Sequence, residues 1–159
     1  MHTAALQHDI GAQLKAALAL DPAVITAGAG NDGVEVNGTG FDRFQFGNTR
    51  FLSGKLVIAW RATLAQDATL SIAANLQDDT AVGFGATPAD YGPALANAVV
   101  ATGPSGGGTV RGVSVIDVDL AGARQFLRAQ VTANLSAANT DTVGICATFI
   151  FGGADQLPV

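Results

Sequence analysis

The sequence predicts a mainly β protein, an antiparallel β-sandwich of jelly-roll-like type with a short N-terminal helix. The chain has 159 residues, the size of one domain, and its 48% hydrophobic content is enough for one core. Only 13% of the residues are charged and 20 are glycine, a composition typical of strands joined by tight turns. From residue 23 onward apolar residues recur with a period of about two, and Gly, Asn and Asp clusters interrupt them.

Residues 1–22 are predicted to form an N-terminal helical arm. Between residues 4 and 20, Leu6, Ile10, Leu14 and Leu18 recur at three- and four-residue spacing, which places them on one helix face. Asp21-Pro22 ends the predicted helix because a residue before proline is pushed out of the helical conformation. We expect this arm either to dock on the domain or to reach a neighbouring subunit.

Residues 23–159 are predicted to form a single β-sandwich domain. The expected strands are residues 23–27, 34–36, 41–46, 56–64, 69–76, 113–120, 125–133 and 143–151. The strands 56–64 and 69–76 are expected to pair as a hairpin across the short link 65–68. A long connection at about 77–112 is regular only at 95–100 and closes in the turn Gly106-Gly107-Gly108. The C-terminal residues 152–159 are expected to be irregular and to lie on a neighbour.

Charge and hydropathy exclude some partners. The net charge is −5 and the eight basic residues are scattered singly, so no basic patch is expected for nucleic acid. The N-terminus lacks a secretory signal pattern, and no apolar run approaches the roughly 18 residues of a spanning helix, so no membrane association is expected. The low charge predicts that part of the surface is buried against other proteins; a low-charge domain that stays alone is the alternative.

The residues that usually carry chemistry are few. Cys146 lies in an apolar run, where a thiol packs as a small hydrophobe, and it has no second cysteine for an internal disulfide. His2 and His8 both precede the sandwich, where they are poorly placed to join an acid and a nucleophile. No zinc, phosphate-loop or nucleophile-elbow motif is present. We therefore expect no catalytic, cofactor-binding or metal-binding residues, no cofactor, and no enzymatic activity.

Two pairs of carboxylates are candidate sites. Asp117 and Asp119 are expected to share a strand face, about 7 Å apart, a separation that suits a calcium ion or an acid pair. The sequence marks no third oxygen ligand, so a solvated strand face is the favoured interpretation. Asp78-Asp79 is predicted to be a turn, because Asp accepts hydrogen bonds from its own downstream backbone.

The aromatic residues are expected to lie mainly in the core. Sugar-binding sandwiches expose several Trp or Tyr rings, whereas this chain has one of each. The rings assigned to the core are Trp60, Phe44, Phe46, Phe126, Phe149 and Phe151.

Short motifs along nearly the whole chain resemble small proteins encoded beside the major capsid protein of tailed bacteriophages. The motifs are Thr26-Ala27, Val34-Glu35-Val36, Gly40-Phe41-Asp42, Leu76-Gln77-Asp78-Asp79, the run 126–131 and the run 149–158. Each motif is short, so the resemblance rests on all of them occurring in the same order along the chain. The chain departs from the family where a tryptophan often follows the acidic pair, since residues 81–85 contain Val82 and Phe84 instead.

The resemblance implies a virion structural protein, a decoration or cement subunit that binds the outer surface of the phage head. It implies the major capsid protein as partner, a location on the capsid surface after synthesis in the host cytoplasm, and no catalytic residues. Capsid shells offer local threefold positions, so a homotrimer is expected. A glycan- or host-surface-binding module and a tail or head-tail connector component remain the alternatives.

Overall fold

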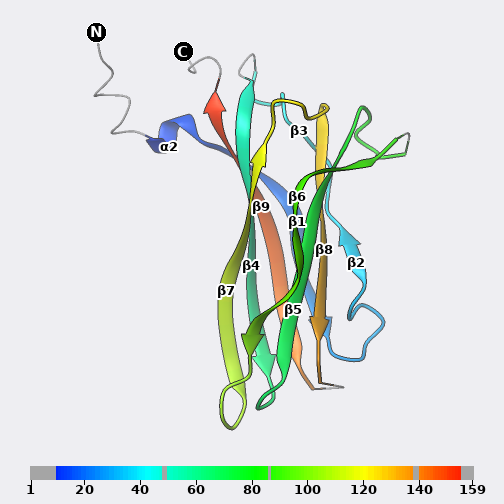
Figure 1. Cartoon of the computed structure of the whole chain (residues 1–159), viewed down its shortest axis with the longest axis vertical. Helices are drawn as coiled ribbons and strands as arrows, with labels where there is room; N and C mark the ends of the chain where they lie inside the picture. Colours follow the sequence, from blue (N-terminus) through cyan, green and yellow to red (C-terminus); the bar gives the residue numbers. More distant parts are fainter. Residues whose placement is uncertain (1–9, 48–49, 86, 138–139, 155–159) are drawn as a thin grey trace.

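The computed structural model describes residues 10–47, 50–85, 87–137 and 140–154, and these residues form two antiparallel sheets packed face to face (Figure 1). The elements are α2 (Ile10–Gln13), β1 (Lys15–Thr26), β2 (Glu35–Asn37), β3 (Phe41–Asp42), β4 (Phe51–Leu64), β5 (Thr69–Asp79), β6 (Ala89–Thr102), β7 (Gly108–Asp119), β8 (Phe126–Leu135) and β9 (Thr142–Ala154). Sheet A has the order β1-β9-β4-β7, and sheet B has the order β2-β8-β5-β6 with β3 also on β8.

The strand order is that of a jelly roll. β2 and β3 act as one strand, because the pairing with β8 advances from Asn37 to Phe41 on one side and from Gln130 to Leu127 on the other, which leaves one extra residue. With these two joined, the first strand pairs with the last, the second with the next to last, the third with the sixth and the fourth with the fifth. The predicted fold class, an antiparallel jelly-roll-like sandwich, is confirmed.

One hydrophobic core lies between the sheets. Alternate residues of β4 and β5 point inward, including Leu56, Ile58, Leu70 and Ile72, all fully buried. A cluster of phenylalanine rings fills one end of this core, with neighbouring centroids 4.8–5.9 Å apart. Its members are Phe41, Phe46, Phe51, Phe149 and Phe151.

The predicted core aromatics divide into three groups. Trp60, Phe149 and Phe151 are buried, and Phe46 and Phe126 are half-buried. The prediction for Phe44 is wrong: its side chain is 40% exposed, and its ring lies against the guanidinium of Arg43 at 4.8 Å. The strand predicted at 41–46 ends at Asp42, so the alternation that would have turned Phe44 inward is lost.

The helical arm predicted for residues 1–22 is wrong over its second half. Residues 1–9 lie outside the described residues. Among the described residues of the arm, only Ile10–Gln13 is helical, and β1 begins at Lys15. Backbone pairing with β9 and burial of Ala19 and Leu20 outweigh the helix propensity of this Ala- and Leu-rich run. The predicted helix stop at Pro22 is a bulge in an edge strand, where the missing N–H of proline costs no ladder bond.

The hairpin predicted for residues 56–64 and 69–76 is also wrong. Both strands exist, but β4 lies in sheet A and β5 in sheet B, so the turn at 65–68 crosses from one sheet to the other. Their apolar residues face each other across the core instead of lying side by side. Sequence alternation predicts the strand but does not tell which neighbour shares its sheet.

The long connection predicted at 77–112 contains regular structure. β5 extends to Asp79, β6 covers Ala89–Thr102, and β7 starts at Gly108. Pro93 is tolerated because β6 is an edge strand, and its pairing with β5 is irregular. The turn at Gly106-Gly107-Gly108 is confirmed, since all three glycines have positive φ.

No described helix is long and apolar enough to cross a membrane.

Candidate interface surface

The outer face of sheet A is apolar at its centre. Two adjacent rows of outward side chains cross the sheet there. The first row consists of Leu18, Thr148, Val57 and Val115, and the second of Cys146, Ala59 and Val113. We call these seven residues the apolar face. Leu18, Val113 and Val115 are 52%, 59% and 46% exposed, an unusual state for large apolar side chains on the solvent side of an antiparallel sheet.

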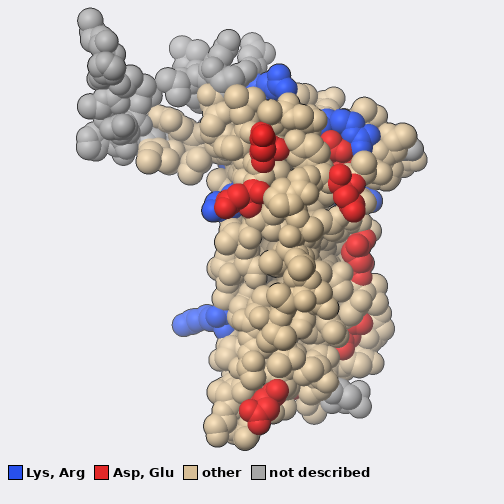
Figure 2. All heavy atoms as spheres, in the orientation of Figure 1, with Lys and Arg blue, Asp and Glu red and all other residues tan. Residues whose placement is uncertain are grey.

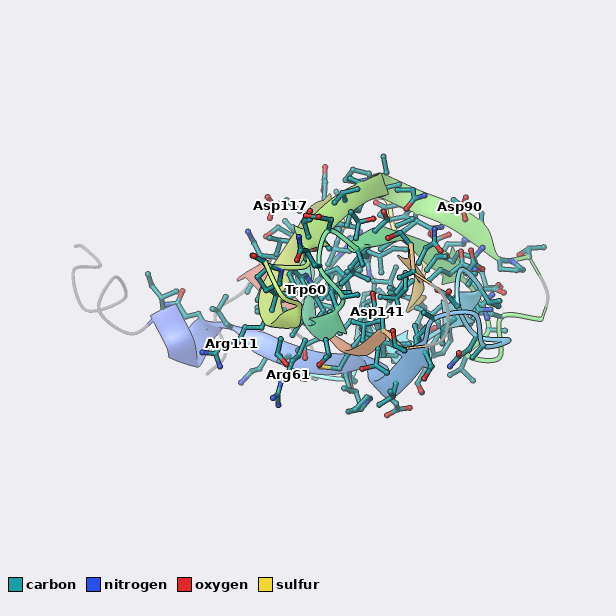
Figure 3. The ribbon with its side chains drawn as sticks, turned by 90° about the horizontal axis from the view of Figure 1, so that it is seen from below. Trp60, Arg61, Asp90, Arg111, Asp117 and Asp141 are labelled. Carbon is teal, nitrogen blue, oxygen red and sulfur yellow. The ribbon has the colours of Figure 1, made fainter. Side chains whose placement is uncertain are left out.

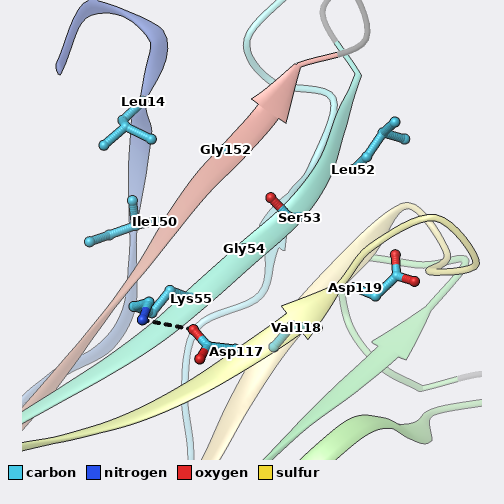
Figure 4. A pocket seen from close by; sticks show the side chains of 10 residues that line it. All are labelled: Leu14, Leu52, Ser53, Gly54, Lys55, Asp117, Val118, Asp119, Ile150 and Gly152. Carbon is cyan, nitrogen blue, oxygen red and sulfur yellow. Dashed lines mark ion pairs between the residues drawn. The ribbon is translucent and has the colours of Figure 1, made fainter. Parts of the chain in front are cut away.

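Charged pairs border the apolar face on both sides. Toward α2, Lys55 and Asp117 stand opposite each other and form an ion pair of 2.7 Å (Figure 4). Toward the other end, Arg61 of β4 stands opposite Arg111 of β7, and both are exposed. Two like charges directly opposite on paired strands repel, and no described residue gives either arginine an ion pair or a side-chain hydrogen bond.

Two shallow hollows lie on this outer face. The first has a volume of about 600 Å³, and Leu14, Leu52, Gly54, Ile150 and Gly152 contribute to its lining (Figure 4). The second, of about 570 Å³, we call the arginine hollow: Arg61 and Arg111 line it together with apolar residues and glycines. Its remaining lining residues are Pro22, Ala23, Val24, Ala59, Trp60, Gly112, Val113, Gly144, Ile145 and Cys146.

The uncharged surface continues around the edge of sheet A. β6 follows β7 at this edge and contains one charged residue, Asp90, with Val99 59% exposed. Figure 2 shows that the middle of the face over β6 and β7 has few charged atoms, whereas charged groups gather at the upper end and along the margins.

The outer face of sheet B has the opposite character. A ladder of polar side chains crosses it: Gln130 donates to Glu35 and Asn37 and accepts from Asn75 at 2.6–2.9 Å. Asp90 accepts from Asn75, so the ladder continues to β6. A hollow of about 480 Å³ is lined by Glu35, Asn75, Asp90 and Gln130 among others, and its lining has no aromatic ring. The polar side chains satisfy one another, as expected of a face that stays in water.

The acidic pair at the end of β5 is structural. Asp78 binds Arg124 through the Arg124 backbone N–H, Nε and Nη2, with the closest contact at 2.6 Å. The hydrogen bonds with Asp78 raise the pKa of Arg124 above its ordinary value. Arg124 also donates to the Thr87 carbonyl, so it ties the β5–β6 link to the β7–β8 link.

Asp79 is fully buried, and its carboxylate accepts hydrogen bonds from the backbone of the residues that follow it. Its oxygens accept from the backbone N–H groups of Thr80, Ala81 and Thr87. Burial acts to raise the pKa of Asp79, but these hydrogen bonds outweigh it and hold the pKa below its ordinary value. The turn predicted at Asp78-Asp79 is wrong, because both residues belong to β5. Asp79 does accept from the downstream backbone as expected, whereas Asp78 binds Arg124.

The β7–β8 link is fixed by side chains from three other segments. Tyr91, Arg43 and Arg50 donate to the consecutive carbonyls of residues 119, 120 and 121. Burial lowers the pKa of Arg43 and raises that of Tyr91, because both lie among packed strands at this end. The link is therefore held rigidly above the core.

The other candidate residues that the structure describes have roles in packing or in local hydrogen bonding. Asp117 and Asp119 share the outer face of β7 as predicted, but Asp117 pairs with Lys55, and Asp119 accepts from the Ala121 backbone at 2.9 Å. Cys146 is a free thiol, half-buried on the apolar face. His2 and His8 lie outside the described residues. Within the described part of the chain, no group of three His, Cys, Asp or Glu side chains is placed to hold a metal ion.

Sequence reasoning missed the arginine pair. Arg61 and Arg111 each occupy a polar position in an apolar run, which is a usual pattern for an outward strand residue. The pairing of β4 with β7 alone brings them together, and no local signal predicts that pairing.

No family model and no curated protein sequence matches the chain. Three solved structures of infectious bursal disease virus proteins are similar in fold. T=1 particles derived from that virus match with 11% identity, over 87% of this chain and 30% of theirs, with a TM-score of 0.44. The structure of the Gt strain matches with 11% identity, over 87% of this chain and 32% of its own, with a TM-score of 0.45. The VP2 subviral particle matches with 10% identity, over 87% of this chain and 31% of its own, with a TM-score of 0.42. This chain spans about a third of the length of these neighbours.

Proposed function

We propose that the chain is a structural protein of a virion, and within that class a decoration or cement protein of a tailed-phage head. It binds the outer surface of the shell, has the major capsid protein as partner, and acts by contact, without catalysis. It is made in the host cytoplasm and ends on the capsid surface. The resemblance in ordered motifs from Thr26-Ala27 to the run 149–158 supports this role.

The apolar face of sheet A is the observation that supports a contact function best. Its centre is uncharged, and ionic or charged groups stand at its margins, which is the arrangement of a protein interface with an apolar core and a polar rim. The outer face of sheet B serves as a comparison within the same molecule, because its polar side chains bond to one another and it has no apolar centre with a charged rim. One face is therefore suited to burial and the other to water.

Bridging between capsid subunits gives such a protein its effect. Each contact is modest, but a subunit held at several points on a shell gains effective concentration at every further point. A homotrimer fits a local threefold position of a shell, and we propose this state for the assembled protein. α2 stands to one side of the sandwich (Figure 1), with Ile10 61% exposed, and with the chain beyond β9 it is our candidate for reaching a neighbour.

Sedimentation with purified heads that lack the protein tests this function. We expect saturable co-sedimentation with the shells and increased resistance of the shells to heat. Val115→Asp, which places a charge in the apolar face, is expected to weaken assembly on the shells, whereas Ser71→Asp on the outer face of sheet B is the matched control. Protein that stays in the supernatant at all shell concentrations would contradict the proposal.

The hollow on sheet B favours a second candidate, a module that binds a glycan or host surface. Amide and carboxylate groups of Asn75, Gln77 and Asp90 surround it, and such groups bind sugar hydroxyls. Their mutual hydrogen bonds and the missing aromatic lining count against it. Binding to a glycan array without binding to heads would favour this module, and binding to isolated tails or connectors would favour a tail or head-tail component.

A further inference from the structure

We propose that copies of this chain contact each other head to tail, with the Val34-Glu35 segment of one copy in the arginine hollow of the next. This inference deepens the proposed function, on which it rests, by naming the surface through which the copies meet. It assigns a second copy of the chain as the occupant of the hollow.

The arginine hollow requires an anionic and apolar occupant. Arg61 and Arg111 face each other across paired strands without an acidic partner among the described residues, so their mutual repulsion is relieved when a carboxylate arrives. Gly144 lies in register with Arg61, and the absence of a side chain there leaves room between Val24 and the arginines. Arginine beside apolar surface is the composition typical of residues that dominate binding energy.

The Val34-Glu35 segment has the matching chemistry. Away from sheet A and the N-terminal residues 10–14, the large apolar side chains exposed by the described residues are Val34, Phe44, Val82 and Val99. Of these, only Val34 adjoins an exposed acid, Glu35, which within the described part of the chain accepts one side-chain hydrogen bond, from Gln130. Glu35 supplies the carboxylate for the two arginines, because both oxygens of the nearby Asp32 accept hydrogen bonds from the backbone N–H groups of Gly28 and Leu135.

The positions of the two surfaces exclude an intramolecular contact. β2 lies at one edge of sheet B, and the hollow crosses the outer face of sheet A (Figures 1 and 3). Different patches on the two partners make the contact heterologous, and a heterologous contact that closes forms a ring. A closed ring of three copies agrees with the proposed trimer.

The native mass in solution without shells tests the contact. We expect the wild-type chain at about three times its mass of 16.0 kDa by light scattering. The double variant Arg61→Glu/Arg111→Glu and the single variant Glu35→Arg are each expected to weaken association on the order of 30-fold or more and to behave as monomers. Asp90→Arg is the matched control: it reverses an exposed acid at the opposite edge of sheet B and is expected to leave the mass unchanged.

Mixing the two dissociated variants distinguishes the geometry. Glu35→Arg keeps an intact hollow and the double arginine variant keeps an intact Val34-Glu35 segment, and the substituted segment and substituted hollow again carry opposite charges. A head-to-tail contact therefore yields oligomers that contain the two variants in equal numbers, whereas either variant alone stays monomeric. The three substitutions combined in one chain restore opposite charges and are expected to restore the oligomer. Circular dichroism confirms that each variant is folded, and Arg61→Gln/Arg111→Gln provides a milder replacement if the double reversal is not.

Three results would overturn the inference. They are a wild-type chain that is monomeric at all concentrations, an oligomer unaffected by the arginine substitutions, and a Glu35→Arg variant that still associates with itself. Shell binding is measured separately by sedimentation, so a monomer that binds heads refutes this contact and leaves the proposed function standing.

Discussion

At the scale of residues, glycines decide where the largest rings of the core fit. A Cβ at Gly112 would lie 2.4 Å from Cζ2 of Trp60, and a Cβ at Gly54 would lie 2.3 Å from the ring of Phe149. In each case the aromatic ring occupies the volume that a side chain at the glycine would need. These glycines are required by close approach of the rings, since neither has a positive φ.

Gly112→Ala tests this close approach. The added methyl must displace the Trp60 ring inside a packed core, and we expect the free energy of unfolding to fall by about 1–3 kcal/mol. Chemical denaturation followed by Trp60 fluorescence measures the change. Gly144→Ala is the control, because the nearest atom to a Cβ there is 3.9 Å away, and an equal loss in both variants would contradict the argument.

Asp79→Asn tests the acid dependence of stability. The pKa of Asp79 in the folded chain lies below its ordinary value near 3.8, so the carboxylate stabilises the fold above that pH and loses this effect as the pH falls through the folded pKa. We expect the variant to melt at a lower temperature than the wild type at neutral pH, and the gap to close below about pH 4. Calorimetry across pH 2–7, with Asp67→Asn as an exposed control, checks this; a gap that widens in acid would contradict it.

At the scale of elements, pairing partners override local preferences. Residues 15–20 read Lys-Ala-Ala-Leu-Ala-Leu, a run that favours a helix by propensity, and yet they form the first half of β1. Their backbone completes the edge of β9, and Ala19 and Leu20 close the core beneath it. The local preference is worth tenths of a kcal/mol per residue, less than the burial of one leucine.

Truncation distinguishes the strand from a detachable arm. Removing residues 1–13 leaves β1 whole, and we expect only a small change in melting temperature. Removing residues 1–22 deletes the buried Leu20 and half of the pairing with β9, and we expect a loss of at least about 2 kcal/mol, comparable to emptying one buried leucine site. Equal melting temperatures for both truncations would show that residues 15–22 are dispensable.

At the scale of the whole molecule, the two outer faces differ in chemistry although they belong to one fold. Sheet A presents the apolar face and an arginine pair without acids, and sheet B presents a hydrogen-bonded polar ladder with Glu35 and Asp90. A monomer gains nothing from such a division, whereas an assembling subunit uses the apolar face for contact and keeps the polar ladder in water except at the β2 edge, where Glu35 meets the next copy in the proposed contact. The sedimentation and native-mass experiments test this difference, because both measure association of whole molecules.

The sequence by itself determined the fold class and most of the strands. Period-two alternation marked seven of the strands to within five residues at each end, and low charge with many glycines predicted a sandwich. Alternation within a strand shows which of its side chains share a face, and this can be recognised without knowing which strands lie beside it.

Tertiary structure alone decided the pairings, and with them the candidate surface. The jelly-roll order places β4 between β9 and β7, which moves β5 to the other sheet and sets Arg61 opposite Arg111. The same pairing turns residues 15–20 into a strand and assembles the apolar face from four strands distant in sequence. Such contacts depend on closure of long loops and on burial shared between strands, and neither quantity is encoded in any short stretch of residues.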